Sequence, residues 1–174
     1  MEAQVRQRIS ASIELFRLPR YEEIPDVGLY LEQVTKYLAD RLAPLAGASI
    51  TGSMISNYVK KKLISNPVKR QYSREQIAYL IFIAVVKMAV PMEDIRLMVS
   101  IQQQTYTPER AYNYFCSEME NVLAYVFGIK GELAEVGVDN SQEKMMLRNT
   151  IITVAHKVYL NALFDALRAG AGGE

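Results

Sequence analysis

The stretch from Thr51 to Arg74 reads TGSMISNYVKKKLISNPVKRQYSR, and it decides how the rest of the chain is interpreted. It contains no Asp or Glu, and its basic residues are Lys60, Lys61, Lys62, Lys69, Arg70 and Arg74. The whole chain holds 20 Lys and Arg against 19 Asp and Glu, so its net charge of +1 conceals one sharply basic segment. A concentrated positive field attracts polyanions. The segment therefore predicts a surface for a polyanionic partner.

The first half of this stretch has the pattern of a short amphipathic helix. Thr51 is a suitable N-cap for a helix over about 52–63. Ile55, Val59 and Leu63 recur at helical spacing and give it one apolar face. The polar side chains that then point outward are Ser53, Ser56, Asn57, Lys60 and Lys61.

The second half predicts a turn and the start of another helix. Asn66-Pro67 is a typical turn dipeptide. Ser73 with Gln76 forms a capping box that opens a helix over about 74–89. Apolar residues cover most of the circumference of that helix, as expected for a central element of the core. Helix, short basic turn and capped helix together are the layout of a helix-turn-helix unit with a small wing.

The remainder of the chain is also predicted to be helical, with no convincing strand beyond a short hairpin in the wing. We expect further helices over about 3–16, 28–42, 107–127 and 141–168, and one more that begins at Pro91. Residues 128–140 are expected to form a loop. The polar run Gln102-Gln103-Gln104-Thr105 is the candidate domain boundary. We therefore expect an all-α fold with an N-terminal helix and connector (1–27), a helix-turn-helix domain (28–101), a small helical domain (105–168) and a tail (169–174).

Composition and motifs exclude several classes of protein. The single cysteine, Cys116, excludes an internal disulfide and a Cys-rich metal site, and we expect it to be a buried, inert thiol. The longest apolar run, Ile77–Val86, is too short to cross a bilayer, and no secretory signal is present, which predicts a soluble cytoplasmic protein. The only histidine, His156, has no catalytic partners nearby and is interpreted as a core or interface residue. We expect no catalytic residues, no metal and no cofactor.

The order of these motifs resembles a known family. The sequence runs from Ile55-Ser-Asn-Tyr58-Val-Lys-Lys-Lys-Leu63 through Tyr72-Ser73 and Ile77-x-x-Leu80 to Pro91-Met-Glu-Asp-Ile95. Over residues 30–101 it resembles the DNA-binding domain of MerR-type regulators. The openings Leu18-Pro-Arg-Tyr21 and Leu29-Tyr-Leu-x-Gln-Val34 are also similar to those of a bacterial family that is known only as a domain of unknown function.

The resemblance to MerR-type regulators implies a role for each outward residue. Ser53, Ser56, Asn57 and Lys60 would face the major groove, and Lys61, Lys69 and Arg70 would hold phosphates. Tyr72 would pack the wing or touch the DNA backbone. The sequence departs from the MerR-type pattern in three places. Lys62 replaces the usual glycine, so we expect the helix to end without a left-handed cap. The connection from Leu42 to Thr51 is long, and the wing over 65–71 is short.

These observations predict a transcriptional regulator that binds double-stranded DNA as a homodimer. The alternative is a protein-interaction or assembly protein that keeps the scaffold without binding DNA, because a lysine run at a helix end is often only a solvated terminus. A group of tyrosines and methionines in the C-terminal half is interpreted as core packing, with a pocket for an aromatic or cationic effector as the less favoured alternative. That group comprises Tyr106, Tyr112, Tyr114, Tyr125, Tyr159, Met119, Met145 and Met146.

Overall fold

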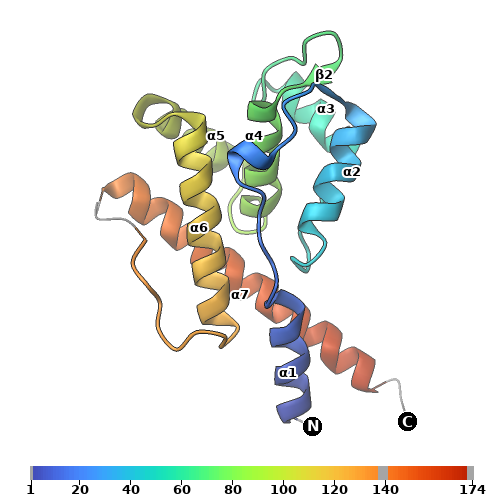
Figure 1. The fold of residues 1–174 in the computed structure, drawn as a ribbon, viewed down its shortest axis with the longest axis vertical. Coiled ribbons are helices and arrows are strands. Elements are labelled where there is room, and N and C mark those ends of the chain that lie inside the picture. The colour runs from blue at the N-terminus through green and yellow to red at the C-terminus, as the bar shows by residue number, and fades with distance from the viewer. Residues whose placement is uncertain (1, 137–140, 172–174) are drawn as a thin grey trace.

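The computed structural model describes residues 2–136 and 141–171 and is mainly helical, which confirms the all-α prediction (Figure 1). In chain order the elements are α1 (Glu2–Ile13), the 3-10 helix η1 (Tyr21–Glu23), β1 (Leu29–Tyr30), α2 (Leu31–Leu42), α3 (Gly52–Lys60), β2 (Gln71–Tyr72), α4 (Arg74–Val86), α5 (Met92–Thr105), α6 (Pro108–Val126) and α7 (Gln142–Ala171). Part of the expected loop (137–140) and the end of the expected tail (172–174) lie outside the described residues. The described part of that tail, 169–171, belongs to α7.

The helices begin where the sequence places their caps. The side chain of Thr51 accepts a hydrogen bond from the Met54 amide at 3.2 Å. Ser73 and Gln76 form the reciprocal capping box, because the Gln76 amide donates to Ser73 Oγ and the Ser73 amide donates to Gln76 Oε1. Thr107 caps α6 in the same way through the Arg110 amide. Each cap satisfies a backbone donor that the first turn leaves unpaired.

Helix α4 lies at the centre of the fold and packs against α2, α6 and α7 (Figure 1). Ile77, Leu80, Ile81 and Ile83 are fully buried on several sides of it. Burial of each such side chain stabilises the fold by about 1.5–3 kcal/mol relative to exposure, which makes α4 the main hydrophobic contributor. The prediction of a central core element at this position is confirmed.

The N-terminal and C-terminal halves of the chain share one continuous cluster of buried side chains. Helices α6 and α7 form the most extensive helix pair, and α7 also contacts α1, α4 and α5. The amide of Asn161 in α7 donates to the Ala46 carbonyl oxygen at 2.9 Å, and Lys157 Nζ donates to the Met88 carbonyl oxygen at 3.1 Å. The polar run at 102–105 forms the last turn of α5, where Gln102 Nε2 donates to the Tyr106 carbonyl oxygen at 2.8 Å.

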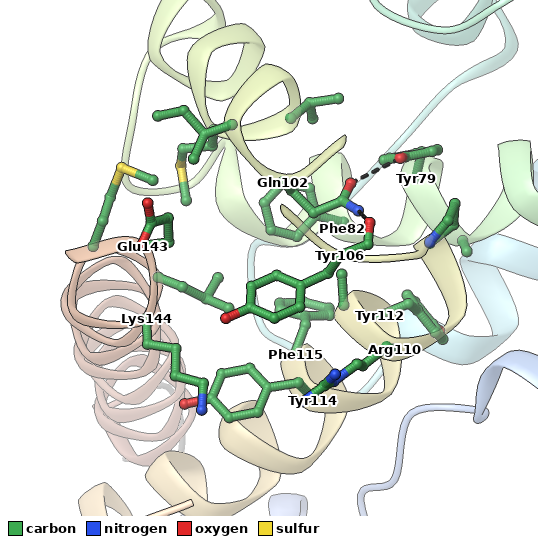
Figure 2. Close-up of a pocket in the computed structure, with 18 residues that line it drawn as sticks. Tyr79, Phe82, Gln102, Tyr106, Arg110, Tyr112, Tyr114, Phe115, Glu143 and Lys144 are labelled. Carbon is green, nitrogen blue, oxygen red and sulfur yellow. Dashed lines mark hydrogen bonds between the residues drawn. The ribbon is translucent and has the colours of Figure 1, made fainter. Parts of the chain in front are cut away.

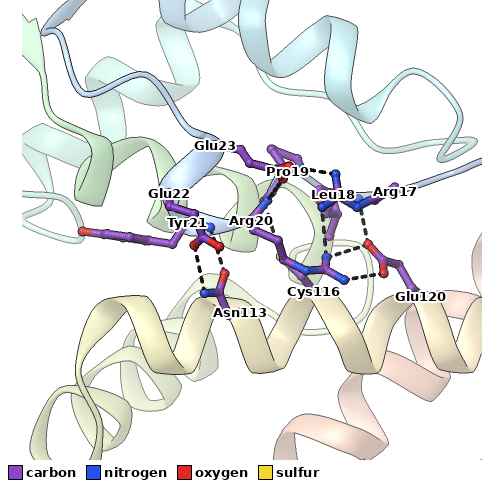
Figure 3. A network of polar contacts seen from close by, with 10 residues as sticks. All are labelled: Arg17, Leu18, Pro19, Arg20, Tyr21, Glu22, Glu23, Asn113, Cys116 and Glu120. Atoms are coloured by element: carbon purple, nitrogen blue, oxygen red, sulfur yellow. Dashed lines mark hydrogen bonds and ion pairs between the residues drawn. The ribbon is translucent and has the colours of Figure 1, made fainter.

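The extended connector after α1 is fixed to α6 by a polar network (Figure 3). Arg20 makes a bidentate ion pair with Glu120, with both nitrogen–oxygen distances at 2.7 Å. The Leu18 amide donates to the same carboxylate, and the Tyr21 amide donates to Asn113 Oδ1 at 2.8 Å. Bidentate, charge-assisted pairs hold both partners in one geometry. The connector is therefore an ordered part of the fold.

The long connection between α2 and α3 is also built into the core. Leu45 and Ile50 are buried, so this connection adds apolar surface to the interior. Gly47 adopts a φ of +92°, and a Cβ atom at this position would collide with the side-chain nitrogen of Asn161. Only glycine adopts this backbone without strain while α7 approaches so closely.

Candidate nucleic-acid interface

Helix α3 presents the polar face that the sequence predicts. Ile55 and Tyr58 are buried, whereas the side chains on the opposite face are exposed. The exposed residues of this face are Ser53, Ser56, Asn57 and Lys60, followed by Lys61 at the C-cap. These side chains do not pack into the core. One surface of this helix therefore presents hydroxyl, amide and ammonium groups to the solvent.

The end of α3 differs from the expectation. Lys62 adopts a left-handed conformation with φ of 57°, although it has a side chain. Its amide donates to the Val59 carbonyl oxygen, and the Leu63 amide donates to the Tyr58 carbonyl oxygen, both at 2.9 Å. This is the pair of bonds that defines a Schellman motif. The prediction that α3 ends without a left-handed cap is therefore wrong, because these two bonds and the burial of Leu63 compensate for the strain at lysine.

The segment that the sequence predicts to be the wing forms a hairpin with a two-residue turn, and a short sheet supports it. Val68 and Gln71 exchange two backbone hydrogen bonds, and the turn between them consists of Lys69 (φ 50°) and Arg70 (φ 65°). Two positive φ values in such a loop are typical of a type I′ turn, which normally favours Asn-Gly. The sequence therefore places two exposed cations where the backbone prefers small residues.

Strand β1 supports this wing and was missed in the sequence. Leu29 and Tyr30 pair antiparallel with Tyr72 and Gln71 of β2, so α2 begins at Leu31 and not at residue 28. Gln76 adds a further tie, because its Nε2 donates to the Ser65 carbonyl oxygen at 2.8 Å. A strand of two residues is too short to show an alternation of apolar and polar side chains, so the sequence alone does not identify it.

Two residues of the basic segment face the protein and not the solvent. Tyr72 is only 5% exposed, and burial raises the pKa of its hydroxyl. Tyr72 therefore packs inside the hairpin region, and its buried side chain is not available to contact a DNA backbone. Arg74 donates from Nε to the Ile24 carbonyl oxygen at 2.9 Å and lies 3.9 Å from Asp26, so it holds the connector. The exposed cations of the segment are Lys60, Lys61, Lys62, Lys69 and Arg70.

Arg96 on α5 is a residue of this surface that sequence reasoning missed. Its Nη2 donates to the Lys61 carbonyl oxygen at 2.7 Å, at the C-terminal end of α3. A cation at a helix C-terminus stabilises the unpaired carbonyls there. Arg96 and the loop that follows α3 together line a groove of about 550 Å³. The spacing between Lys61 and Arg96 gives no local signal, because the contact forms only when α5 packs beside α3.

The two isolated residues of the C-terminal half have different environments. Cys116 is buried, and its thiol donates to the Pro19 carbonyl oxygen (Figure 3). Burial raises the pKa of this thiol to about 12, as expected for an inert cysteine. His156 is exposed on α7, so its interpretation as a core residue is wrong. Its place on the outer face of the helix leaves the interface interpretation as a prediction.

The group of tyrosines and methionines divides between the core and a cavity. Tyr106, Tyr112, Tyr114 and Met146 line a cavity of about 360 Å³ between α4, α5, α6 and α7 (Figure 2). The other four do not line it. Met119 is buried in the core, Tyr159 packs edge-on against Phe127, and Tyr125 and Met145 are exposed. Core packing therefore explains only part of the group.

Comparison with known proteins identifies a family but no activity. The family model described as "Domain of unknown function (DUF1836)" matches residues 19–115, which cover the connector, the elements from β1 to α5 and the first part of α6. No curated protein and no solved structure matches the chain. Because the match spans more than half of the sequence, the chain belongs to the DUF1836 family of proteins with a domain of unknown function.

Proposed function

We propose that this protein is a DNA-binding transcriptional regulator with a MerR-like winged helix-turn-helix. One observation carries the proposal. Helix α3, which has an exposed polar face, and the hairpin with the exposed Lys69 and Arg70 lie at the same end of the molecule, opposite α1 and the C-terminal end of α7 (Figure 1). A helix that reads base edges beside a basic hairpin that holds the backbone is a common arrangement for recognition of a duplex.

The side chains of the interface divide into two roles. Ser53, Ser56, Asn57 and Lys60 are assigned to base edges in the major groove, where asparagine bonds adenine bidentately and lysine bonds guanine. Lys61, Lys69 and Arg70 are assigned to phosphates, which fix the register of the protein on the duplex. Lys62, at the end of α3, joins this phosphate-binding set because its side chain is also exposed.

The backbone strain of the basic residues supports this assignment. Among the described residues, those other than glycine with positive φ are Lys62, Lys69 and Arg70. A left-handed conformation costs a residue with a side chain about 1–2 kcal/mol. Strain of this kind concentrates at functional sites, because a fold without such a requirement would place glycine or asparagine there. All three positions instead have a side chain with an exposed positive charge.

We also propose that the protein acts as a homodimer through the outer face of α7. Leu160, Phe164 and Leu167 are 46–48% exposed and recur at helical spacing along the last turns of this helix. His156 lies one turn earlier on the same face and is also exposed. A second copy of this helix would cover the apolar stripe. Two half-sites then provide the specificity that a single module of this size lacks.

Fluorescence anisotropy with random-sequence duplex DNA across a salt series tests the proposal. Each neutralised phosphate contributes about −0.9 to the log–log salt slope, so the four cations of one protomer that are assigned to phosphates predict a slope of about −3.6. The double variant Lys60→Ala with Lys61→Ala should lower the affinity by roughly tenfold and make the slope shallower by about one, because only Lys61 of the two is assigned to a phosphate. Its helix content and melting temperature should be unchanged because both side chains are exposed.

The matched control removes two positive charges from the other end of the molecule. Arg6 and Arg8 are exposed on α1, and the variant Arg6→Ala with Arg8→Ala should bind DNA like the wild type. Equal losses in both double variants would indicate attraction by net charge alone. Absence of binding even at low salt would refute the regulator and favour the alternative, a protein-interaction scaffold whose basic surface binds an acidic protein.

A further inference from the structure

The cavity between the two halves of the chain has the size and composition of a small-molecule site. Its volume is about 360 Å³, within the range of ligand pockets, and side chains from four helices enclose it. Helices α4 and α5 come from the helix-turn-helix half, and α6 and α7 come from the C-terminal half (Figure 2). The cavity is thus a product of the packing between these halves.

Aromatic rings from α4 and α6 and from Tyr106 form part of its wall, and contacts with one another orient several of them. Phe82 and Phe115 pack edge to face, with their centroids 5.2 Å apart, and Tyr112 lies 6.2 Å from Phe115. The Tyr79 hydroxyl donates to Gln102 Oε1 at 2.8 Å, and this bond fixes the position of the Tyr79 ring against α5. Rings that are already oriented present flat apolar surfaces without a further loss of side-chain entropy. The wall therefore favours a flat, mostly apolar molecule.

The charged groups at the cavity select among such molecules. The guanidinium of Arg110 lies over the ring of Tyr106, with its Cζ atom 5.3 Å from the ring centroid. On the other side Lys144 Nζ lies 5.1 Å from the centroid of Tyr114 (Figure 2). Glu143 is the one carboxylate among the described residues that line the cavity, so positive charge predominates.

Arg110 is the group best placed to bind an anion. It is exposed, and within residues 2–136 and 141–171 no carboxylate lies at ion-pair distance from it. The contact with the Tyr106 ring is a cation–π contact, and the guanidinium N–H groups of Arg110 donate no hydrogen bond to the described residues. A guanidinium with available N–H groups binds a carboxylate in a planar, bidentate arrangement.

We propose that this cavity binds a flat, mostly apolar molecule that carries one carboxylate, with its rings between Tyr106 and Phe115 and its carboxylate on Arg110. The presence of Glu143 across the cavity disfavours a second acidic group at that end (Figure 2). The ligand class is therefore that of aromatic monocarboxylic acids. The proposal concerns ligand binding by the free protein and does not depend on whether the basic surface binds DNA.

Calorimetric titration of the full chain with three probes of equal shape tests this class. The probes are 1-naphthoate, neutral 1-naphthalenemethanol and cationic 1-naphthylmethylammonium, each measured without DNA. We expect 1-naphthoate to bind about tenfold more tightly than the neutral probe, as one charge-assisted contact at a partly solvated site provides. The cationic probe should bind most weakly. No binding of 1-naphthoate at millimolar concentration, or tighter binding of the cation, would overturn the proposal.

Two variants locate the site. Arg110→Gln should remove the preference for 1-naphthoate and leave binding of 1-naphthalenemethanol unchanged, and it should fold normally because Arg110 is exposed. Ala111→Phe places a ring in the cavity from α6 and should abolish binding of all three probes. If Arg110→Gln bound 1-naphthoate as tightly as the wild type, the carboxylate assignment would be wrong even where the cavity itself is occupied.

Discussion

At the residue scale, the positively charged positions with left-handed backbone distinguish this surface from an ordinary solvated face. A lysine run at the end of a helix needs no explanation beyond its interaction with the helix dipole. Strained lysine and arginine in a type I′ turn do need one, because Asn-Gly would form the same hairpin at lower cost. At Lys69 and Arg70 the positive charge is therefore expected to affect DNA binding, whereas the left-handed backbone affects stability. Substitutions can change these two properties independently.

The wing-tip variant Lys69→Asn with Arg70→Gly should stabilise the protein and weaken its binding to DNA. Removal of the left-handed strain should raise the free energy of unfolding by about 1–2 kcal/mol, measured by urea denaturation. Loss of two phosphate contacts should lower DNA affinity and make the salt slope shallower by nearly two. The control Lys69→Ala with Arg70→Ala removes the charges and keeps the strain, so it should weaken binding without a gain in stability. A wing-tip variant that is no more stable than the wild type would contradict the strain argument.

At the element scale, the contact between α6 and α7 contains a buried carboxylate. The side chain of Glu118 on α6 is fully buried, and its Oε1 lies 3.2 Å from Nε of Arg148 on α7. Burial raises the pKa of Glu118, and the nearby cations Arg148 and Lys144 oppose that shift only in part. A charged group in this position costs more to bury than a neutral one unless its partner compensates fully.

This contact makes the stability of the fold dependent on pH. Because the folded pKa of Glu118 lies above the unfolded value of about 4.3, the folded state binds more protons in that window. The contribution of Glu118 is thus fully present below pH 4.3 and is lost as the pH rises through the folded pKa. We expect the unfolding free energy of the wild type, measured relative to Glu118→Gln, to fall across that range.

The control for this measurement is Glu14→Gln, which removes one negative charge from an exposed site. Its unfolding free energy relative to the wild type should not follow the trend that Glu118→Gln reveals. A difference between wild type and Glu118→Gln that stays constant with pH, or that rises, would show that Arg148 holds the carboxylate charged throughout.

At the scale of the whole molecule, the exposed apolar stripe on the outer face of α7 predicts a dimer. The variant Leu160→Lys with Phe164→Lys should convert the dimer to a monomer in sedimentation velocity, because it places two like charges in the apolar stripe of each copy. The fold should persist, since both side chains are exposed in the protomer. The control Val27→Lys with Leu97→Lys alters two other exposed apolar residues and should stay dimeric. A wild type that sediments as a monomer at micromolar concentration would refute the dimer.

Much of the fold follows from local sequence signals. Thr51, Ser73 and Thr107 cap their helices as predicted, because a cap depends on one side chain and the amide a few residues away. The outward face of α3 was also predictable from the spacing of Ile55 and Tyr58. No finding of the structure tests whether that face binds DNA, and this assignment stays a prediction.

The sequence by itself thus determined the helical class, the starts of the three helices with side-chain caps and the exposed basic segment, since these depend on periodicity, capping and charge along the chain. Only the tertiary structure decided the rest. It turned Tyr72 and Arg74 inward, exposed His156, allowed a left-handed Lys62 and brought Arg96 to the end of α3. It also opened a cavity between helices that are distant in sequence. The physical reason is common to all of these features: each depends on packing between elements, and the local pattern contains no information about the partner.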